Sequence, residues 1–300
     1  MKATAPSLAQ TVPAEKSWVA IYADLFKARL TFLVLLTTLV GYYVGFRGPV
    51  DYLLMVHTLL GTALVAAGAS ALNQLFERKY DAKMRRTRER PLPSGRLQPQ
   101  AVLIVGSSAA LLGLVYLALA VNLITCGLGA FSLLSYLFIY TPLKRVTWLN
   151  TAVGAVPGGL PPLMGWTAAR GEFNREGLAL FAILALWQLP HFMAIAWIYR
   201  DEYAKAGFRM LPVVDPDGHR TGRQAVLHAL GLLLVSLCPF VFRLTGPTYL
   251  FGAMLLGTVF LWYAIQFSRY LTLSRARQLF YASILYLPLL LGAMVLDKLP

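Results

Sequence analysis

The stretch NQLFERKYDAKMRRTRERPLPSG, residues 73–95, follows a long apolar run and concentrates charged side chains. Asn73, Glu77 and Asp81 recur within it at every fourth position. On a helix these side chains share one face and spread over roughly 12 Å. Amide and carboxylate oxygens in such a column are suitable ligands for magnesium. The spacing therefore predicts a helix whose C-terminal end presents a magnesium site.

A dense basic run follows the acidic residues directly. Arginine side chains match phosphate oxygens with paired N–H donors, and lysine adds a point charge. Acidic ligands beside cationic donors predict a site for a metal-bound diphosphate. The alternative is a basic orientation signal at the end of a membrane helix, which explains the arginines but not the acidic column. The basic residues are Lys83, Arg85, Arg86, Arg88, Arg90 and Arg96.

The composition indicates an all-α protein that crosses a membrane several times. The 300 residues are 58% hydrophobic and 13% charged, with a mean hydropathy of +0.61, whereas soluble domains carry about twice this charged fraction. Several apolar runs reach about 20 residues, which is enough to cross a bilayer. A membrane barrel would instead need short alternating segments. Cys126 and Cys238 lie in apolar runs, so we expect core thiols and no disulfide framework.

The apolar pattern predicts one domain, residues 18–300, preceded by a disordered polar tail, residues 1–17. Residues 18–30 are expected to form an amphipathic helix at the interface, with Trp18, Tyr22 and Phe26 on one side. The first apolar run is expected to be a retained span, not a signal peptide. The nine predicted spans are about 30–46, 52–76, 100–120, 122–140, 148–168, 176–198, 224–243, 247–268 and 277–296.

The loop charges predict the orientation of these spans. Cytoplasmic loops are enriched in Lys and Arg, and most of the 27 such residues fall on the side of the N-terminus. We therefore expect a cytoplasmic N-terminus and active site, and a C-terminus on the opposite side. The net charge of +14 then reflects topology and phosphate binding, and no nucleic-acid partner is expected. The Lys and Arg residues that fall on the side opposite the N-terminus are Arg47, Arg170, Arg175, Arg243 and Lys298.

A second polar cluster lies at the end of the predicted span 176–198. Arg200, Asp201 and Lys205 follow this span, on the side that also carries residues 78–96. Charged residues beside a span often mark a substrate path. The alternative is a solvated helix end with an Asp201–Lys205 pair. A third patch, Tyr140 and Lys144 in YTPLKR, is either a further phosphate contact or a plain topology signal.

The predicted span 148–168 is unusual because it contains NTAVGAVPGGLPPLMGW, residues 150–166. The Gly158-Gly159 pair and the prolines predict a bent or broken helix. Irregular backbone persists in a membrane only against protein or a polar cavity. The span therefore either shapes a pocket or contains a packing kink.

Four motifs resemble the UbiA-type intramembrane prenyltransferases, in particular the branch that acts on haem. They are RTRERPLPSG at 86–95, GAVPGGLPPLMGW at 154–166, WQLPHF at 187–192 and DEYAKAGFRMLPVV at 201–214. The resemblance extends over roughly residues 20–295. It implies nine transmembrane helices around a central cavity that opens laterally to lipid. It also implies farnesyl diphosphate as the donor and protohaem IX (haem b) as the acceptor.

The resemblance also implies roles for individual residues. It assigns the binding of magnesium and diphosphate to Asn73, Glu77 and Asp81, with Asp201 as a further catalytic residue. The residues expected to bind diphosphate are Lys83, Arg86, Arg90, Tyr140, Lys144, Arg200 and Lys205. Trp187, Gln188 and His191 of WQLPHF are expected to contact haem, because imidazole is a common ligand of haem iron; the alternative is a hydrogen-bonded core histidine. The second motif departs from the wider family, because only Asp201 stands there between Tyr199 and Tyr203.

The expected reaction is ionisation of farnesyl diphosphate followed by attack of a haem vinyl group, which gives haem O and diphosphate. One alternative is a prenyltransferase for an aromatic acid or a quinone precursor, which would share the diphosphate site. Others are a transporter with broken helices and a structural partner of a respiratory complex. The compartment is either a bacterial inner membrane or an organelle, and the absence of a transit peptide favours the bacterial inner membrane. The expected partner is a haem A synthase or an oxidase assembly partner.

Overall fold

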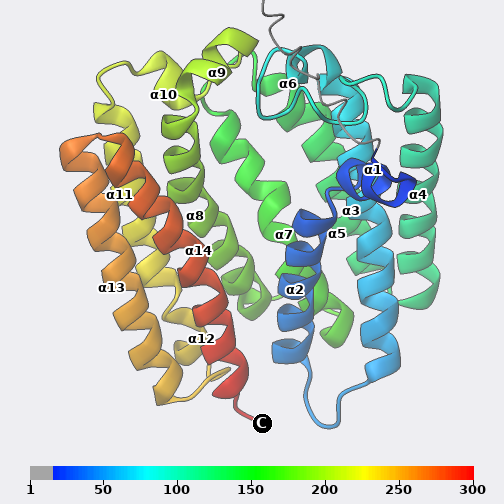
Figure 1. The fold of residues 1–300 in the computed structure, drawn as a ribbon. Coiled ribbons are helices and arrows are strands. Elements are labelled where there is room, and N and C mark those ends of the chain that lie inside the picture. Colours follow the sequence, from blue (N-terminus) through cyan, green and yellow to red (C-terminus); the bar gives the residue numbers. More distant parts are fainter. Residues whose placement is uncertain (1–15) are drawn as a thin grey trace, which may run out of the picture.

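The computed structural model describes residues 16–300, which fold into a bundle of long helices (Figure 1). The tail predicted for residues 1–17 lies outside the described residues except for its last two positions. Within the described part, Cys126 and Cys238 are both free thiols and partly buried, as predicted.

Nine long helical segments form the bundle within residues 16–300, which confirms the all-α prediction. Eight of them have the length and apolar composition needed to cross a membrane; the remaining one is the Gly- and Pro-rich α7. The segments are α2 (Ala28–Gly45), α3 (Tyr52–Asp81), α4 (Pro99–Ala120), α5 (Leu123–Leu134) continued by η1 (Ser135–Tyr140) and α6 (Thr141–Leu143), α7 (Asn150–Arg170), α8 (Arg175–Ile198), α11 (His219–Val235) followed by α12 (Cys238–Val241), α13 (Pro247–Tyr270) and α14 (Leu273–Leu296).

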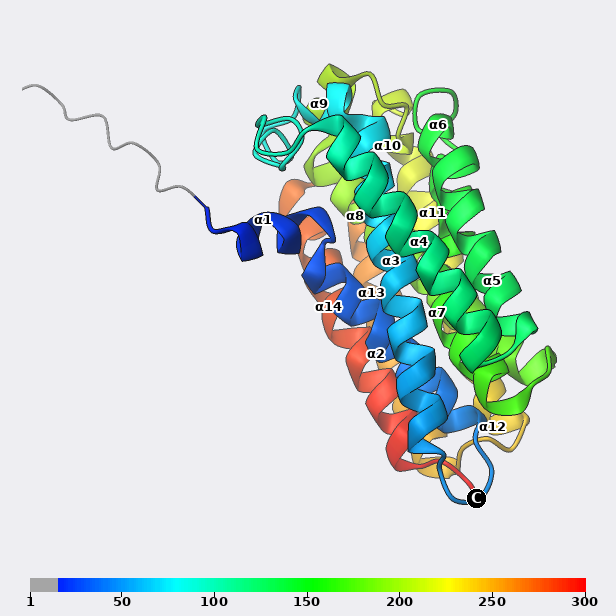
Figure 2. The same cartoon turned by 90° about the vertical axis from the view of Figure 1, so that its right-hand side faces the viewer.

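The N-terminal helix α1 (Trp18–Leu25) lies across the bundle axis (Figure 2). Trp18, Tyr22 and Phe26 form a row with ring centroids 6.4 and 5.9 Å apart, which agrees with the predicted aromatic side. The helix is shorter than the predicted 18–30, because Lys27 adopts a left-handed conformation with φ 48° and ψ 53°. Residues other than Gly rarely adopt this conformation. The chain therefore turns sharply at Lys27 before α2 begins.

Two hydrophobic cores meet at α7. One joins α7 with α2, α8, α11, α13 and α14, and the other joins α1, α3, α4 and α5. Small residues allow the close approach: a Cβ on Gly68 would meet Ala110 N of α4 at 2.6 Å. Gly165 of α7 likewise lies against the Thr38 carbonyl of α2. Helix contacts in membranes commonly use small residues in this way.

Helix α7 is continuous from Asn150 to Arg170 although it contains Pro157, Pro161 and Pro162, so the predicted break is not found. Pro161 has no N–H to donate to the carbonyl of Pro157, four residues earlier. Ser132 Oγ of α5 donates to that carbonyl at 3.2 Å. A neighbouring side chain thus satisfies the freed backbone group, which is how membrane helices tolerate proline.

Gly165→Val is expected to destabilise the protein by about 3 kcal/mol, because the added side chain would overlap the α2 backbone. Thermal unfolding of the detergent-solubilised protein, followed by the loss of monodisperse protein, measures the effect. Gly127→Val is the matched control, since a Cβ on Gly127 meets none of the described atoms within 4 Å. Equal unfolding temperatures for the two variants would contradict the proposed α2–α7 contact.

The polar motifs lie at one end of the bundle, at the top of Figure 1. This end carries the loop 82–98, α6, α9 (Arg200–Ala206) and α10 (Leu211–Val214), whereas the C-terminus lies at the other end. The ends of α3 and α8 therefore face the same side, as the positions of the two motifs predicted.

Candidate active site

The candidate site begins with three buried polar side chains on one face of α3. Asn73, Glu77 and Asp81 are only 1%, 6% and 1% exposed. Burying a carboxylate costs free energy unless the charge is paired. The column predicted from the spacing is therefore present, and it requires partners.

Each member of the column contacts its own cation from another part of the chain. Lys27 Nζ donates to Asn73 Oδ1 at 3.0 Å, and Lys144 Nζ donates to Glu77 Oε1 at 2.7 Å. Arg90 Nη1 donates to Asp81 Oδ2, also at 2.7 Å. Three oxygen groups thus face three cations. A negatively charged ligand that enters here therefore meets both the side-chain oxygens and the cations.

Lys27 is a site residue that the sequence analysis counted only as a topology charge. The buried amide of Gln74 holds it in place, because Nε2 donates to the carbonyls of Asp24 and Leu25 at 3.0 and 2.7 Å. These bonds tie the end of α1 to α3, and the left-handed turn then directs Lys27 toward Asn73. Burial and the positive charges of Arg90 and Lys144 lower the pKa of Lys27 to about 7. An anionic ligand would favour its charged form.

Lys144 follows a segment of π-helix, η1, which is a common feature of functional sites. Its Nζ lies 4.5 Å from the centre of the Tyr140 ring, so the predicted Tyr140–Lys144 patch reaches the column. Burial disfavours the charged form of Lys144, but the adjacent Glu77 carboxylate raises its pKa above the usual value. Thr141 adds a further contact, because its Oγ1 accepts a bond from Asn73 Nδ2 at 3.1 Å.

Arg86 connects the first motif to the second. Its Nη2 donates to Tyr203 Oη at 2.9 Å, and its backbone N–H donates to Glu202 at 3.3 Å. The guanidinium also lies 5.1 Å from the centre of the Tyr199 ring. The loop 82–98 is thereby attached to α9. Lys83, in contrast, is exposed and lies 6.0 Å from the Tyr80 ring.

The charged residues of α9 lie at the surface. The side chain of Asp201 is 89% exposed and pairs with Arg200 at 3.8 Å. Arg200 lies over the Trp197 ring at 4.9 Å, and Lys205 is exposed. The structure thus brings Asn73, Glu77, Asp81, Arg90, Tyr140 and Lys144 together, and it places these three residues of α9 outside that cluster.

Trp187 and His191 of α8 both point toward α14. Their rings stack at 4.9 Å, and Phe280 stacks on the other side of His191 at 5.2 Å. His191 Nδ1 lies 2.7 Å from Ser283 Oγ, and that hydroxyl donates to the Phe280 carbonyl at 2.5 Å. Because the Ser283 hydroxyl proton is directed to Phe280, Ser283 Oγ accepts a hydrogen bond from His191 Nδ1–H, which leaves the lone pair on Nε2. This tautomer suits binding of a metal by Nε2.

Gln188 lies on a different side of α8. Its Nε2 donates to the Leu184 carbonyl at 3.0 Å, and its Oε1 packs against Gly158 of α7. Of the three residues predicted to contact haem, the structure groups Trp187 and His191 and turns Gln188 toward α7.

The column fits magnesium by its donor chemistry. Within residues 16–300, no group of three or more His, Cys, Asp and Glu side chains is arranged to hold a metal, because the column contains two carboxylates and one amide. Magnesium usually takes one or two carboxylates and completes its shell with water and substrate phosphate. In addition, Gln74 Oε1 is buried and finds no partner among the described residues. The residues present therefore suit a metal that arrives with diphosphate.

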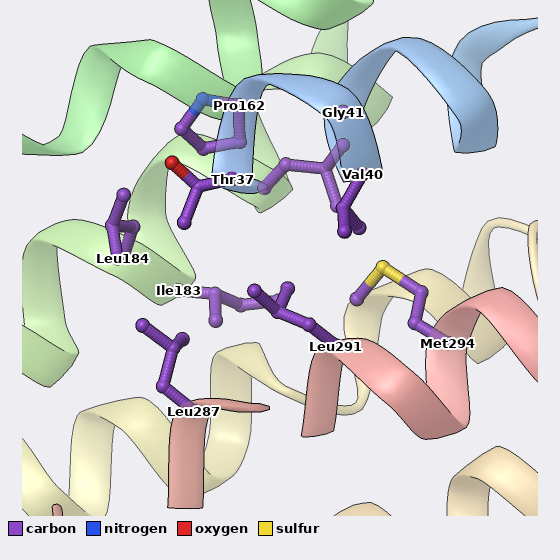
Figure 3. Close-up of a pocket in the computed structure, with 10 residues that line it drawn as sticks. Thr37, Val40, Gly41, Pro162, Ile183, Leu184, Leu287, Leu291 and Met294 are labelled. Carbon is purple, nitrogen blue, oxygen red and sulfur yellow. The ribbon is translucent and has the colours of Figure 1, made fainter. Parts of the chain in front are cut away.

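An apolar pocket lies deeper in the bundle, where α2, α7, α8 and α14 meet (Figure 3). Its volume is about 10 Å³, and Thr37 supplies its one hydroxyl, which donates to the Val34 carbonyl. The opposing walls include Val40, Ile183 and Leu287. A long isoprenoid chain would fit here only if α2 and α14 separated.

The fold and the site define a class: an intramembrane enzyme that binds an anionic substrate where a helical bundle meets the aqueous phase. The profile of the UbiA prenyltransferase family matches residues 34–287, and the chain belongs to that family.

Two relatives match almost the whole chain. A protein named protoheme IX farnesyltransferase from Solibacter usitatus (strain Ellin6076) is 49% identical over 286 residues, which cover 92% of this chain and 98% of that protein. A protein of the same name from Koribacter versatilis (strain Ellin345) is 42% identical over 308 residues and 99% of each chain.

Solved structures also share the fold. Digeranylgeranylglyceryl phosphate synthase superposes with a TM-score of 0.79 at 17% identity, covering 93% of this chain and 98% of that one. A UbiA homologue from Archaeoglobus fulgidus bound to DMAPP and Mg²⁺ gives a TM-score of 0.64 at 15% identity, covering 91% and 98%. At these identities the likeness concerns the fold alone.

Proposed function

We propose that this protein transfers the farnesyl group of farnesyl diphosphate to a vinyl group of protohaem IX, giving haem O and diphosphate. The observation that carries the transfer chemistry is the pairing of three buried oxygen groups with Lys27, Lys144 and Arg90. The choice of acceptor rests on the relatives named protoheme IX farnesyltransferase. They favour haem over an aromatic acid or a quinone precursor.

Binding of diphosphate changes the partners of the three cations that face the column. Asn73, Glu77 and Asp81 would hold magnesium, which supplies positive charge to the leaving diphosphate when bound. Lys27, Lys144 and Arg90 would then turn from these oxygens to the phosphate oxygens. Arg86 would help by keeping the loop 82–98 closed on α9. Lys83, Arg200, Lys205 and Asp201 remain proposed contributors that would have to turn inward from the surface.

The chemical step breaks the bond between farnesyl C1 and the diphosphate oxygen, and the bonding electrons leave with diphosphate. Cations placed where this negative charge develops stabilise the transition state. The stacked rings of Tyr136 and Tyr140, 5.6 Å apart, lie beside Lys144, and aromatic faces favour an allylic cation. The haem vinyl group then forms the new C–C bond. Water adds to the resulting cation and loses a proton, which completes the hydroxyethylfarnesyl group.

We place the haem acceptor beside Trp187 and His191. The Ser283 contact fixes the His191 ring and leaves Nε2 for haem iron. Gln188 would shape the neighbouring α7 wall. We further propose a bacterial inner membrane location, a cytoplasmic N-terminus and site, a C-terminus on the opposite side, and delivery of haem O to a haem A synthase or an oxidase assembly partner.

The purified protein, given protohaem, farnesyl diphosphate and Mg²⁺, is expected to produce a haem whose mass increases by one farnesyl group and one hydroxyl group. Chelation of Mg²⁺ is expected to reduce the rate by at least a hundredfold, because charge on the leaving diphosphate is then poorly neutralised. Mass spectrometry of the extracted haem measures both results. A farnesylated aromatic acid in place of a modified haem, when both acceptors are offered, would contradict the proposal.

His191→Ala is expected to weaken haem binding about tenfold and to leave farnesyl diphosphate binding unchanged, because the residue contacts α14 and not the column. Haem titration by absorbance and a separate KM for farnesyl diphosphate distinguish the two effects. The matched control is His57→Ala, since His57 also bonds a hydroxyl, Tyr116 Oη, at 2.7 Å. Equal weakening of both substrates would remove the proposed role of His191.

A further inference from the structure

A groove of about 490 Å³ lies behind the acidic column, between the end of α3 and the segment η1–α6. This volume falls in the range of small-molecule sites. Glu77 and Thr141 line the groove and also belong to the candidate active site. The other groove residues lie on α3 and η1, in and after α6, and after α9, so the groove shares a wall with the active site and extends beyond it.

One side of the groove is apolar and open to the outside of the bundle. The rings of Phe76 and Phe138 lie 6.0 Å apart, and these side chains are 43% and 61% exposed. Large apolar side chains that are exposed on a transmembrane bundle face lipid chains. The groove therefore opens toward the bilayer.

The other side of the groove is cationic. Arg78, Lys79 and Arg145 line it, and the one lining carboxylate, Glu77, is already paired with Lys144. Arg145 is held in position, because its Nη1 donates to Tyr80 Oη at 2.6 Å and its guanidinium lies 4.9 Å from the Tyr80 ring. Arg78 instead donates to the Leu75 carbonyl at the end of α3. Lys79 and Arg145 thus provide the positive charge available to a ligand.

We propose that this groove binds one anionic phospholipid of the surrounding bilayer, with its phosphate at Lys79 and Arg145 and an acyl chain along Phe76 and Phe138. A phosphate head joined to an apolar chain matches both sides of the groove, whereas free phosphate matches the cationic side alone. A zwitterionic lipid would bring a positive group next to these cations. The groove offers no unpaired carboxylate to bind that group, because Glu77 is already paired with Lys144.

Native mass spectrometry of the whole protein, released from detergent that contains phosphatidylglycerol or phosphatidylcholine, tests the proposal. The expected result is one retained phosphatidylglycerol per protein and little phosphatidylcholine. Each cation removed is expected to lower retention about fivefold, so Lys79→Gln and Arg145→Gln combined have the largest effect. Arg277→Gln is the control, since Arg277 is an exposed cation near the start of α14 and does not line the groove.

Two further variants keep the result clear if the double variant is unstable. Lys79→Gln alone preserves the Arg145–Tyr80 bond, and Arg145→Lys preserves the charge and should retain the lipid. Equal retention of the two phospholipids, or unchanged retention in the Lys79→Gln and Arg145→Gln double variant, would overturn the proposal. Displacement of phosphatidylglycerol by an equal amount of farnesyl diphosphate would also overturn it, because the groove would then be a substrate entrance.

Discussion

Asp81→Asn is expected to reduce farnesyl transfer on the order of a thousandfold while the protein still folds. The substitution removes a carboxylate that would bind magnesium beside the leaving diphosphate, and losses of electrostatic stabilisation reach this size. The fold should persist because Asn can still accept the bond from Arg90 through its side-chain oxygen. In addition, Thr87 Oγ1 bonds the backbone carbonyl of residue 81, which the substitution leaves in place.

The single-turnover rate with saturating Mg²⁺ measures the effect, and the thermal unfolding temperature reports the fold. Glu89→Gln is the matched control, because Glu89 is a carboxylate of the loop that follows Asp81 and its side chain is 65% exposed. Near-wild-type transfer by the Asp81→Asn variant would show that the column does not bind the metal. A large fall in unfolding temperature would instead show that the carboxylate is structural.

Lys27→Met is expected to lower transfer about a hundredfold, because one of the three cations that face the column is lost. The loss should appear mainly as a higher KM for farnesyl diphosphate and a lower rate of ionisation. Binding of haem, which we propose to occur at His191, should not change. Lys16→Met is the control, since Lys16 precedes α1 and pairs with Asp24, and its side chain is 40% exposed.

Gln74→Leu tests the contact between Lys27 and Asn73 indirectly, because Gln74 holds the chain that carries Lys27. It removes the two hydrogen bonds that fix the end of α1, so the ammonium of Lys27 should lose its position and activity should fall about tenfold. If Gln74 acts through Lys27, the two substitutions together cost little more than Lys27→Met alone. Fully additive losses would show that Gln74 acts independently, for example as a metal ligand through Oε1.

The sequence alone predicts the chemistry of this site because the key groups lie on single helices. Asn73, Glu77 and Asp81 share one face through helical periodicity, which does not depend on tertiary packing. The spans follow from hydropathy for a similar reason, since a bilayer imposes one length and one kind of surface on each helix. These features required no knowledge of which helices are neighbours.

Of the two outcomes predicted for α7, a bent or a broken helix, the break is not found, because a neighbouring side chain can satisfy the backbone group that proline leaves free. The sequence indicates the missing N–H of Pro161, but it does not reveal that Ser132 of α5 bonds the freed carbonyl. The helix therefore continues without a break. Similarly, the motif WQLPHF predicts a polar group of three residues, but the helical angle sends Gln188 to α7 and His191 to α14.

What the sequence determined by itself is the all-α membrane architecture, the acidic column and the presence of basic loops at its end of the bundle. What only the tertiary structure decided is which cation meets which oxygen: Lys27 with Asn73, Lys144 with Glu77 and Arg90 with Asp81. It also placed Asp201 at the surface. The physical reason is that helical periodicity acts over a few residues, whereas ion pairs between segments depend on how the helices pack and where the chain turns.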